Sequence, residues 1–354
     1  MKRFLGKAGI MLVLLIFLCV LTTLSHAWYP LEIREQTGDE TAQEDFFSMD
    51  TPMTVLVSGK NAKEEAREAR EMLEGEDARW SPTKEGSDVY RINHHIGAYV
   101  GVAEETKELI AQSIRVGRET NGALDITLLP VLRAWGFSGG AHRVPRDDEL
   151  QAARVLTGLA KLHSKDGREP AVMLESGGIE LGATAKGYAS ELVAERLRAK
   201  GITSALLNLG GNVEVIGKKP NGSLWKIGIR NPFGGDPIGV LQVSDTSVVT
   251  SAIDQRFFTD QTGHHYWHII DPTTGKPAQS GLASATIIMP DCGYADALST
   301  AVFVMGKDSA FALWKEKGDF EMILVAMNGK IYVTEGIQAA FTPSEGFTVE
   351  VLHE

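Results

Sequence analysis

The pattern of apolar residues changes at Gly201, and this change constrains the fold more than any other feature of the sequence. Before it, apolar residues recur with helical spacing; after it, short strand-like segments are separated by Gly, Pro, Asn and Asp. The expected helices of the first part cover residues 61–75, 107–122, 147–163 and 184–200, after a strand at 53–58. The expected strands of the second part cover residues 205–209, 213–217, 225–230, 239–243 and 284–289. Helices packed on antiparallel or mixed sheet give an α+β fold.

The C-terminal part adds two helices and a hairpin. The helices are expected at residues 294–305 and 307–317, and the hairpin strands at 321–327 and 330–334. Asn328-Gly329 between those strands suits a two-residue type I′ turn. A chain of 354 residues is long enough to bury a large core, in one intertwined domain or in two lobes.

The N-terminus has the pattern of a secretory signal. Three basic residues stand within the first seven, residues 8–24 carry no charge, and small residues occupy positions 25 and 27. The alternative is an uncleaved membrane anchor, but the apolar run is slightly short for a span, which needs about 20 residues. We therefore expect an exported protein, periplasmic or at the outer face of the cytoplasmic membrane. Its expected parts are a signal peptide (1–27), a polar tether (28–47), a globular domain (48–340) and a C-terminal tail (341–354).

The charge and cysteine content narrow the classes of function. The net charge is −11 and no Lys/Arg-rich run occurs, which argues against a nucleic-acid partner. Cys292 is the only cysteine outside the predicted signal, so core packing and not a disulfide framework must hold the domain together. An acidic protein that binds an anionic ligand must use local devices, namely backbone N–H groups, helix N-termini or a divalent metal.

A carboxylate and a hydroxyl are spaced for a metal site near the start of a predicted helix. Asp296 and Thr300 are four residues apart and therefore share a helical face. Oxygen ligands of this kind suit Mg²⁺, and Mn²⁺ would accept the same set. The alternative is ordinary helix-start chemistry, in which Asp favours the helix dipole and Thr bonds back to a carbonyl.

Three further motifs could contribute to binding or catalysis. The segment ELGATAKGYA carries Glu180 and Lys186 where the chain enters a helix, an arrangement that can present N–H groups to phosphate or merely permit close packing. Asp125 stands among apolar residues and needs a hydrogen-bonding partner. His268 precedes a Pro/Gly turn, where it could accept a proton from a hydroxyl or make a structural hydrogen bond.

Seven segments together resemble the ApbE family, the FAD:protein FMN transferases. They occur in the family's order, span roughly residues 45–335, and read SMDTPMTV, GALDITLLPVLRAWGF, ELGATAKGYA, LLNLGGNVEVIG, WKIGIRNP, HIIDPTTGKP and ADALSTAVFVMG. The resemblance implies an α+β fold of two lobes of mixed or antiparallel sheet with packed helices, and an FAD groove between the lobes. It implies Mg²⁺-dependent transfer of FMN from FAD to a Thr or Ser hydroxyl of an acceptor flavoprotein, with release of AMP.

The resemblance also assigns roles to residues. Side-chain oxygens of Asp296 and Thr300 and the backbone carbonyl of Ala183 would bind Mg²⁺. His268 would contact FAD and deprotonate the acceptor hydroxyl. The other positions that match the family's FAD contacts are Met49, Ala123, Leu124, Asp125, Glu180 and Lys186. The resemblance implies that the partners are proteins with an FMN-binding domain and that these proteins are subunits of membrane electron-transfer complexes. The protein is therefore expected to work near a membrane.

Two departures from the family pattern and three alternative functions stay open. Glu180 stands where Asp is usual, and Ala252-Ile253-Asp254 stands where Gly-Asp-Tyr is common. The same metal and diphosphate contacts would serve an FAD pyrophosphatase, in which water replaces the acceptor hydroxyl. A non-catalytic FAD-binding protein is a second alternative, although storage would not need a metal at the diphosphate. Covalent FMN on this chain itself, at residues 280–286, is a third.

Overall fold

The computed structural model describes residues 40–165 and 170–354. The predicted signal peptide and most of the predicted tether lie outside these residues. Residues Asp39–Glu354 form one compact unit of the chain. Within the described residues, every helix is too short or too polar to cross a membrane.

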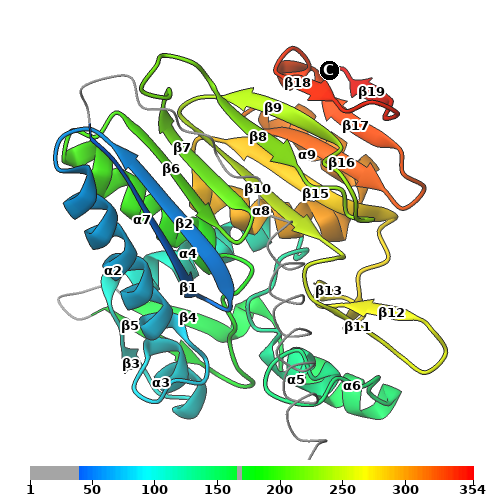
Figure 1. The fold of residues 1–354 in the computed structure, drawn as a ribbon. Coiled ribbons are helices and arrows are strands. Elements are labelled where there is room, and N and C mark those ends of the chain that lie inside the picture. Colours follow the sequence, from blue (N-terminus) through cyan, green and yellow to red (C-terminus); the bar gives the residue numbers. More distant parts are fainter. Residues whose placement is uncertain (1–39, 166–169) are drawn as a thin grey trace, which may run out of the picture. The chain divides into compact units, whose positions relative to one another are not determined.

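A nine-stranded sheet organises this unit (Figure 1). Its strand order is β1-β2-β6-β7-β10-β15-β16-β17-β19, and all neighbours are antiparallel except β17 and β19. The strands are β1 (Thr41–Ser48), β2 (Thr51–Ser58), β6 (Ser204–Leu209), β7 (Asn212–Gly217), β10 (Thr246–Ala252), β15 (Leu282–Met289), β16 (Glu321–Ala326), β17 (Ile331–Thr334) and β19 (Val349–Leu352). The interior strand β15 is buried along its whole length, as expected for a strand that is covered on both faces.

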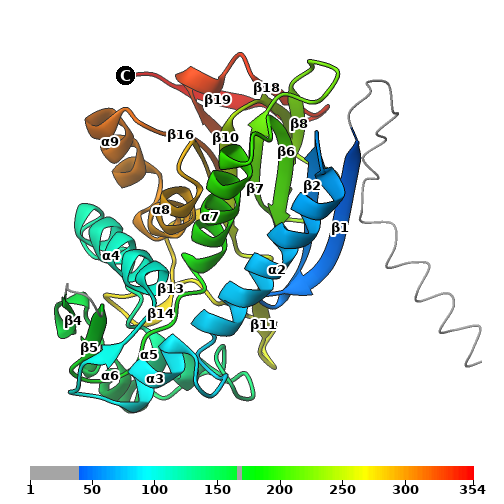
Figure 2. The ribbon, with the colours of Figure 1, turned by 90° about the vertical axis from the view of Figure 1, so that its left-hand side faces the viewer.

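Helices cover one face of the sheet, as Figure 2 shows. Helices α2 (Ala62–Trp80), α7 (Ala185–Ala199) and α8 (Cys292–Met305) pack on the strands, whereas α4 (Glu104–Glu119) and α9 (Lys307–Lys317) pack on α8 from outside. Because α8 lies between the sheet and these outer helices, most of its residues are buried, and most of them are apolar. The side chain of Asp291 caps its N-terminus by accepting a hydrogen bond from the Tyr294 N–H at 2.7 Å.

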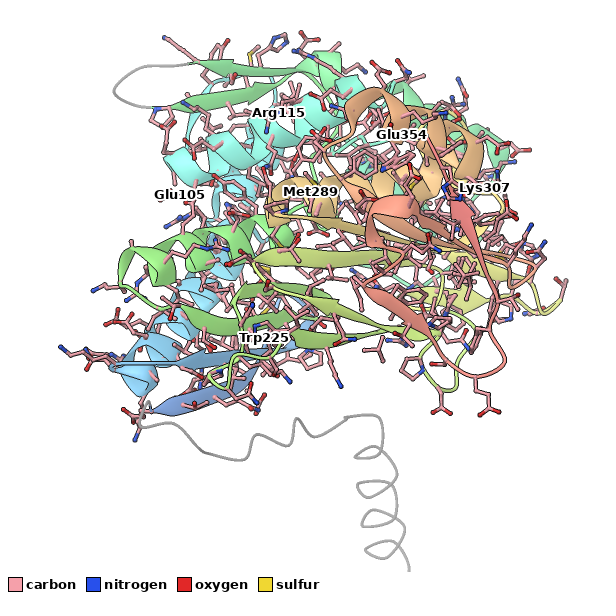
Figure 3. The ribbon with its side chains drawn as sticks, turned by 90° about the horizontal axis from the view of Figure 1, so that it is seen from above. Glu105, Arg115, Trp225, Met289, Lys307 and Glu354 are labelled. Carbon is pink, nitrogen blue, oxygen red and sulfur yellow. The ribbon has the colours of Figure 1, made fainter. Side chains whose placement is uncertain are left out.

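A second, smaller sheet covers the other face. It contains β8 (Trp225–Ile229), β9 (Gly239–Val243) and β18 (Phe341–Pro343) in the order β18-β9-β8. Trp225 is 1% exposed and lies in an apolar core between the two sheets. Figure 3 shows Trp225 on one side of the large sheet and Glu105 and Arg115 of α4 on the other.

Smaller elements complete the unit. Helix α3 (Asp88–His94) packs near a three-stranded sheet of β3 (Val100–Gly101), β4 (Leu162–Lys165) and β5 (Ala171–Leu174). Helices α5 (Leu129–Trp135) and α6 (Asp147–Val155) share a separate apolar cluster with the hairpin β11 (Phe257–Thr259) and β12 (His265–Trp267) and the strand β13 (Ile270–Asp271), which pairs with β14 (Lys276–Pro277). Two 3₁₀ turns cover Leu159–Lys161 and Glu335–Ile337.

The predicted α+β class is confirmed, and the structure corrects several boundaries. Residues 41–47, assigned to the tether, form most of β1, because a polar strand suits the solvent-exposed edge of a sheet. The predicted tail 341–354 contains β18 and β19, whose Phe341 and Leu352 are buried. The predicted helix 147–163 ends at Val155, because Gly158 takes a positive φ of 129° that no helix accommodates.

The turn at Asn328-Gly329 also differs from the prediction. The hairpin β16–β17 is present, but only Gly329 has a positive φ, of 81°. A type I′ turn needs positive φ at both central residues, so the prediction of that turn type is wrong.

Candidate active site

A cavity of about 500 Å³ lies where segments from both sides of Gly201 meet. Its wall includes the β1–β2 turn, the β6–β7 turn, the end of β10, the N-terminus of α7 and one face of α8. All ten residues that the sequence predicted for the site line this cavity: Met49, Ala123, Leu124, Asp125, Glu180, Ala183, Lys186, His268, Asp296 and Thr300. The structure therefore brings the predicted set together, while the role of each residue stays a prediction.

Asp296 lies at the contact between α7 and α8. Its Oδ2 accepts a hydrogen bond from the Gly187 N–H at 2.8 Å, so a carboxylate of α8 pairs with a free N–H group in the first turn of α7. Asp296 is only 4% exposed, and burial raises the pKa of its carboxyl. The charge of Lys186 and the Gly187 N–H lower that pKa in part. A carboxylate that is buried and only partly compensated favours a cation beside it.

Glycine at position 187 allows this close approach of the two helices. A Cβ at Gly187 would lie 2.3 Å from the Cys292 carbonyl oxygen and 2.4 Å from the Asp296 Cβ. Both distances are far below a normal van der Waals contact. The second glycine of the ELGATAKGYA segment therefore serves helix packing, and its N–H binds a carboxylate of this chain.

Thr300 lies one helical turn after Asp296, on the same face of α8 as predicted. Ser251 at the end of β10 shares hydrogen bonds with the hydroxyls of Thr300, at 3.0 Å, and Ser299, at 2.8 Å. Ser299 also donates to the Asp296 backbone carbonyl at 2.9 Å. This hydroxyl network couples the end of β10 to α8 and holds the Thr300 oxygen at the cavity wall.

The segment that leads into α7 is fixed by local hydrogen bonds. Glu180 Oε1 accepts from the Gly182 N–H at 3.0 Å, and Lys186 Nζ donates to the Gly182 carbonyl at 3.1 Å. Burial, and to a smaller extent the charge of Asp50, raises the pKa of Glu180. The hydrogen bond from the Gly182 N–H and the charges of Arg256 and Lys186 lower it in part. The N-terminus of α7 and Lys186 thus place positive charge at the cavity, which favours an anionic ligand.

Asp125 has the hydrogen-bonding partner that its apolar surroundings require. Its Oδ1 accepts from the Thr127 N–H at 2.7 Å and from the Thr127 hydroxyl at 2.6 Å. Burial raises the pKa of Asp125, and these bonds and Lys161 oppose that effect. Because Oδ1 takes both bonds, Oδ2 is the oxygen available to a ligand. Leu124, 2% exposed, packs behind it.

His268 is half-buried and held by the backbone of Arg256. Its ring Nδ1 lies 3.1 Å from the Arg256 carbonyl oxygen, and its backbone N–H donates to the same oxygen at 3.0 Å. Burial, and then the charges of Arg256 and Lys186, lower the pKa of His268 to about 4. The imidazole is therefore neutral at pH 7, as a proton acceptor must be.

Met49 and Asp50 form a strained turn at the cavity. They are the two residues between the paired Ser48 and Thr51, with φ of 48° and 58°. This is the two-residue loop of a type I′ hairpin, in which Asn and Gly are the usual residues. A non-glycine residue in this region costs roughly 1 kcal/mol or more, so backbone strain lies at the cavity wall.

Acidic groups outnumber basic groups in the cavity wall. Six carboxylates line it, from Asp50, Asp77, Asp125, Glu180, Asp254 and Asp296. Three cationic groups face them, from Lys186, Arg230 and Arg256. Such a wall would repel a diphosphate unless a divalent cation were also bound.

The predicted metal ligands fit Mg²⁺ by their chemistry. Asp296, Thr300 and Ala183 offer a carboxylate, a hydroxyl and a backbone carbonyl, all of them hard oxygen donors. The part of the chain that the structure describes holds no group of three or more His, Cys, Asp or Glu side chains able to bind a metal. The set is therefore of the kind in which phosphate oxygens and water complete the coordination of Mg²⁺.

The set predicted from the sequence leaves out several polar residues of the cavity wall, including two arginines. Arg230 and Asp254 form an ion pair of 2.7 Å between Nε and Oδ2, and Arg256 and Asn212 also line the wall. Asn212 is 2% exposed. Asp254 was noted only as a departure from the family pattern, and Arg230 lies in the WKIGIRNP segment without being singled out. Arg230, Asp254 and Arg256 lie in loops that follow β8 and β10, for which periodicity gives no signal, whereas Asn212 begins β7.

Comparisons with known proteins identify relatives of this chain in sequence and in fold. The family model described as "ApbE family" matches residues 49–324. An FAD:protein FMN transferase of Vibrio cholerae is 32% identical over 68% of this chain and 73% of its own length. One of Treponema pallidum is 29% identical over 91% of this chain and 93% of its own length. The crystal structure of the ApbE protein of Thermotoga maritima has a TM-score of 0.79 at 33% identity and covers 85% of this chain and 99% of the other.

Fold and relatives together define an enzyme of the transferase class. The chain belongs to the ApbE family, which confirms the resemblance drawn from the seven sequence segments.

Proposed function

We propose that this protein is an FAD:protein FMN transferase that moves FMN from FAD to a Thr or Ser hydroxyl of an acceptor flavoprotein. The observation that carries the proposal is the convergence of Asp296, Thr300, Lys186 and His268 on one cavity in a member of the ApbE family. The acceptor oxygen would form a bond to the FMN-side phosphorus of FAD. The bond from that phosphorus to the bridging oxygen would break, and AMP would leave with the oxygen.

His268 is the candidate base in this reaction. A carbonyl oxygen can only accept a hydrogen bond, so the contact with Arg256 requires the ring proton on Nδ1. Nε2 is then unprotonated and can take the proton of the acceptor hydroxyl. The lowered pKa of His268 favours the neutral imidazole at neutral pH, and the bound diphosphate would raise that pKa toward the range of an effective base.

Asp296, Thr300 and the Ala183 carbonyl are the candidate ligands of a magnesium ion. Mg²⁺ bound there would neutralise phosphate charge and stabilise the charge that develops on the leaving oxygen. Lys186 and the N-terminus of α7 would hold the diphosphate from the other side. Asp296 is positioned for this role by Gly187, which pairs with one carboxylate oxygen, Oδ2.

The acceptor and the location are part of the same proposal. An FMN-binding domain of a membrane electron-transfer complex would present the hydroxyl, and the apolar N-terminal segment would direct this chain to the periplasm or the outer membrane face. Export is consistent with a domain that has a single, buried free thiol.

The test is a complete assay with the full-length protein in detergent, FAD, MgCl₂ and an FMN-binding domain. Intact mass spectrometry follows both proteins, and chromatography follows AMP and FMN. An FMN-sized mass increase on the acceptor with equimolar AMP supports the transferase. Free FMN and AMP with unmodified acceptor would show a pyrophosphatase instead, and tight FAD binding without turnover would show a binding protein.

A further inference from the structure

We propose that Arg256 is a positioning residue for His268: its backbone carbonyl fixes the imidazole tautomer, and its guanidinium, anchored on Phe137, holds that carbonyl in place. The inference rests on the proposed role of His268 as the base. It concerns a residue outside the set predicted from the sequence, in the loop between β10 and β11, twelve residues before the histidine.

The first support is the double hydrogen bond to one oxygen. The Arg256 carbonyl accepts from the His268 backbone N–H at 3.0 Å and from its ring Nδ1–H at 3.1 Å. Main chain and side chain of the histidine are thus oriented by the same atom. The tautomer with the proton on Nδ1 is imposed, since the partner atom offers no proton of its own.

The second support is the anchorage of the arginine. Arg256 Nη2 donates to the Phe137 carbonyl at 3.1 Å. Phe137 is 6% exposed, its N–H donates to the Leu132 carbonyl at 2.9 Å, and its ring meets the His268 ring edge-on with centroids 6.5 Å apart. The guanidinium therefore ties the residue before β11 to the turn that follows α5, and the same phenylalanine packs on the histidine.

The third support is the charge near the imidazole. Arg256 and Lys186 are the two charged groups that act on His268, and both disfavour a second ring proton. The charge of Arg256 also lowers the pKa of Glu180, which lines the same cavity. A diphosphate that pairs with these cations would weaken their effect on His268, so the base would become stronger when the substrate is bound.

The first experiment reads the tautomer directly. The full-length protein in detergent is labelled with ¹⁵N-histidine, and the His268 signal is assigned by its loss in His268→Gln. Nitrogen shifts of a neutral imidazole with the proton on Nδ1 are expected at pH 7. A proton on Nε2 would overturn the proposal, whatever the enzyme's activity.

Two substitutions then separate geometry from charge. Arg256→Met removes both the bond to Phe137 and the charge, so the His268 titration midpoint should rise and the rate of acceptor modification at pH 7 should fall roughly tenfold to 100-fold. Arg256→Lys keeps the charge, so the midpoint should stay near that of the wild type while the rate recovers only in part. A wild-type midpoint and rate in Arg256→Met would overturn the proposal.

Arg230→Met is the matched control for the titration. Arg230 lines the same cavity but pairs with Asp254 and does not act on His268. Arg230→Met should leave the His268 tautomer and the His268 titration midpoint unchanged. If Arg230→Met shifted the midpoint as much as Arg256→Met does, any nearby positive charge would have the same effect, and the specific role of Arg256 would be overturned. If Arg256→Met does not fold, the proposal is tested by the His268 tautomer in the wild-type protein and by the rate and titration midpoint of Arg256→Lys. If His268→Gln transferred FMN to the acceptor at the wild-type rate, the proposed role of His268 as the base would be refuted. The tautomer measurement does not test that role.

Discussion

The carboxylate of Asp296 and the backbone N–H of Gly187 are joined by a hydrogen bond of 2.8 Å between two helices. The bond places one carboxylate oxygen at the first turn of α7 and the residue itself in the wall of the cavity. The candidate metal ligand and the helix N-terminus that would face phosphate are thus parts of one packing contact. Disturbing either partner should affect both stability and catalysis.

Replacing Asp296 with Asn should abolish transfer while the fold is kept. The amide oxygen can still accept from Gly187, but the charge that would bind Mg²⁺ is lost. We expect the rate of acceptor modification to fall at least about 100-fold, the scale of losing one preorganised electrostatic contact. The assay is run over a range of MgCl₂, with circular dichroism as the check on folding. Unchanged rates at low MgCl₂ would exclude Asp296 as a ligand.

Gly187→Ala should destabilise the protein, because the new methyl group meets the Cys292 carbonyl and the Asp296 side chain. Overpacking of this kind typically costs about 1–3 kcal/mol. Gly75→Ala is the matched control: Gly75 also lies inside a helix, with nothing within 4 Å of the added Cβ. It should be neutral or add about 0.5–1 kcal/mol of stability. Urea unfolding gives both values, and equal effects would refute the packing argument.

The pKa of His268 predicts a loss of stability in mild acid. In the folded protein this pKa is lowered from 6.5 to about 4, so between these values the unfolded chain binds more protons. Stability should therefore fall as the pH falls from about 6.5 toward 4. His268→Gln removes this contribution and should flatten the curve of stability against pH in that window. Free energies of unfolding at pH 7.5 and 5 test the difference.

Glu214 predicts the opposite dependence at higher pH. Its side chain is fully buried on β7, and burial followed by the charge of Glu191 raises its pKa to about 8. Between about 4.5 and 8 the folded protein binds the extra proton, so ionisation costs stability as the pH rises. Glu214→Gln keeps an acceptor for the Ser190 hydroxyl and should gain stability relative to wild type between pH 5 and pH 8.5. A constant difference across that range would contradict the assignment.

Much of the fold followed from the sequence because its elements are strongly periodic or bounded by Gly. Helix α7 and strands β6 and β7 were predicted within one or two residues, since Gly201 and Gly210-Gly211 mark their ends. Strand β1 was missed because an edge strand needs no apolar alternation.

The site was predicted unevenly for a similar reason. The ten predicted residues came from segments with family resemblance, and spacing alone placed only Asp296 and Thr300 together. Contacts between distant segments, such as Asp296 with Gly187 or Arg256 with Phe137, are set by tertiary packing. No local pattern encodes them, so the positioning role of Arg256 emerged only from the structure.

The buried thiol of Cys292 can report on the opening of the candidate metal site. It is the only cysteine outside the predicted signal segment, it is fully buried, and its carbonyl lies against Gly187 at the helix contact that holds Asp296. Ser190 of α7 lies beside the thiol, so opening of the contact between α7 and α8 would expose it to a thiol reagent. The rate at which Cys292 is labelled therefore reports how often the helix contact that holds Asp296 opens, and no probe has to be introduced into the protein.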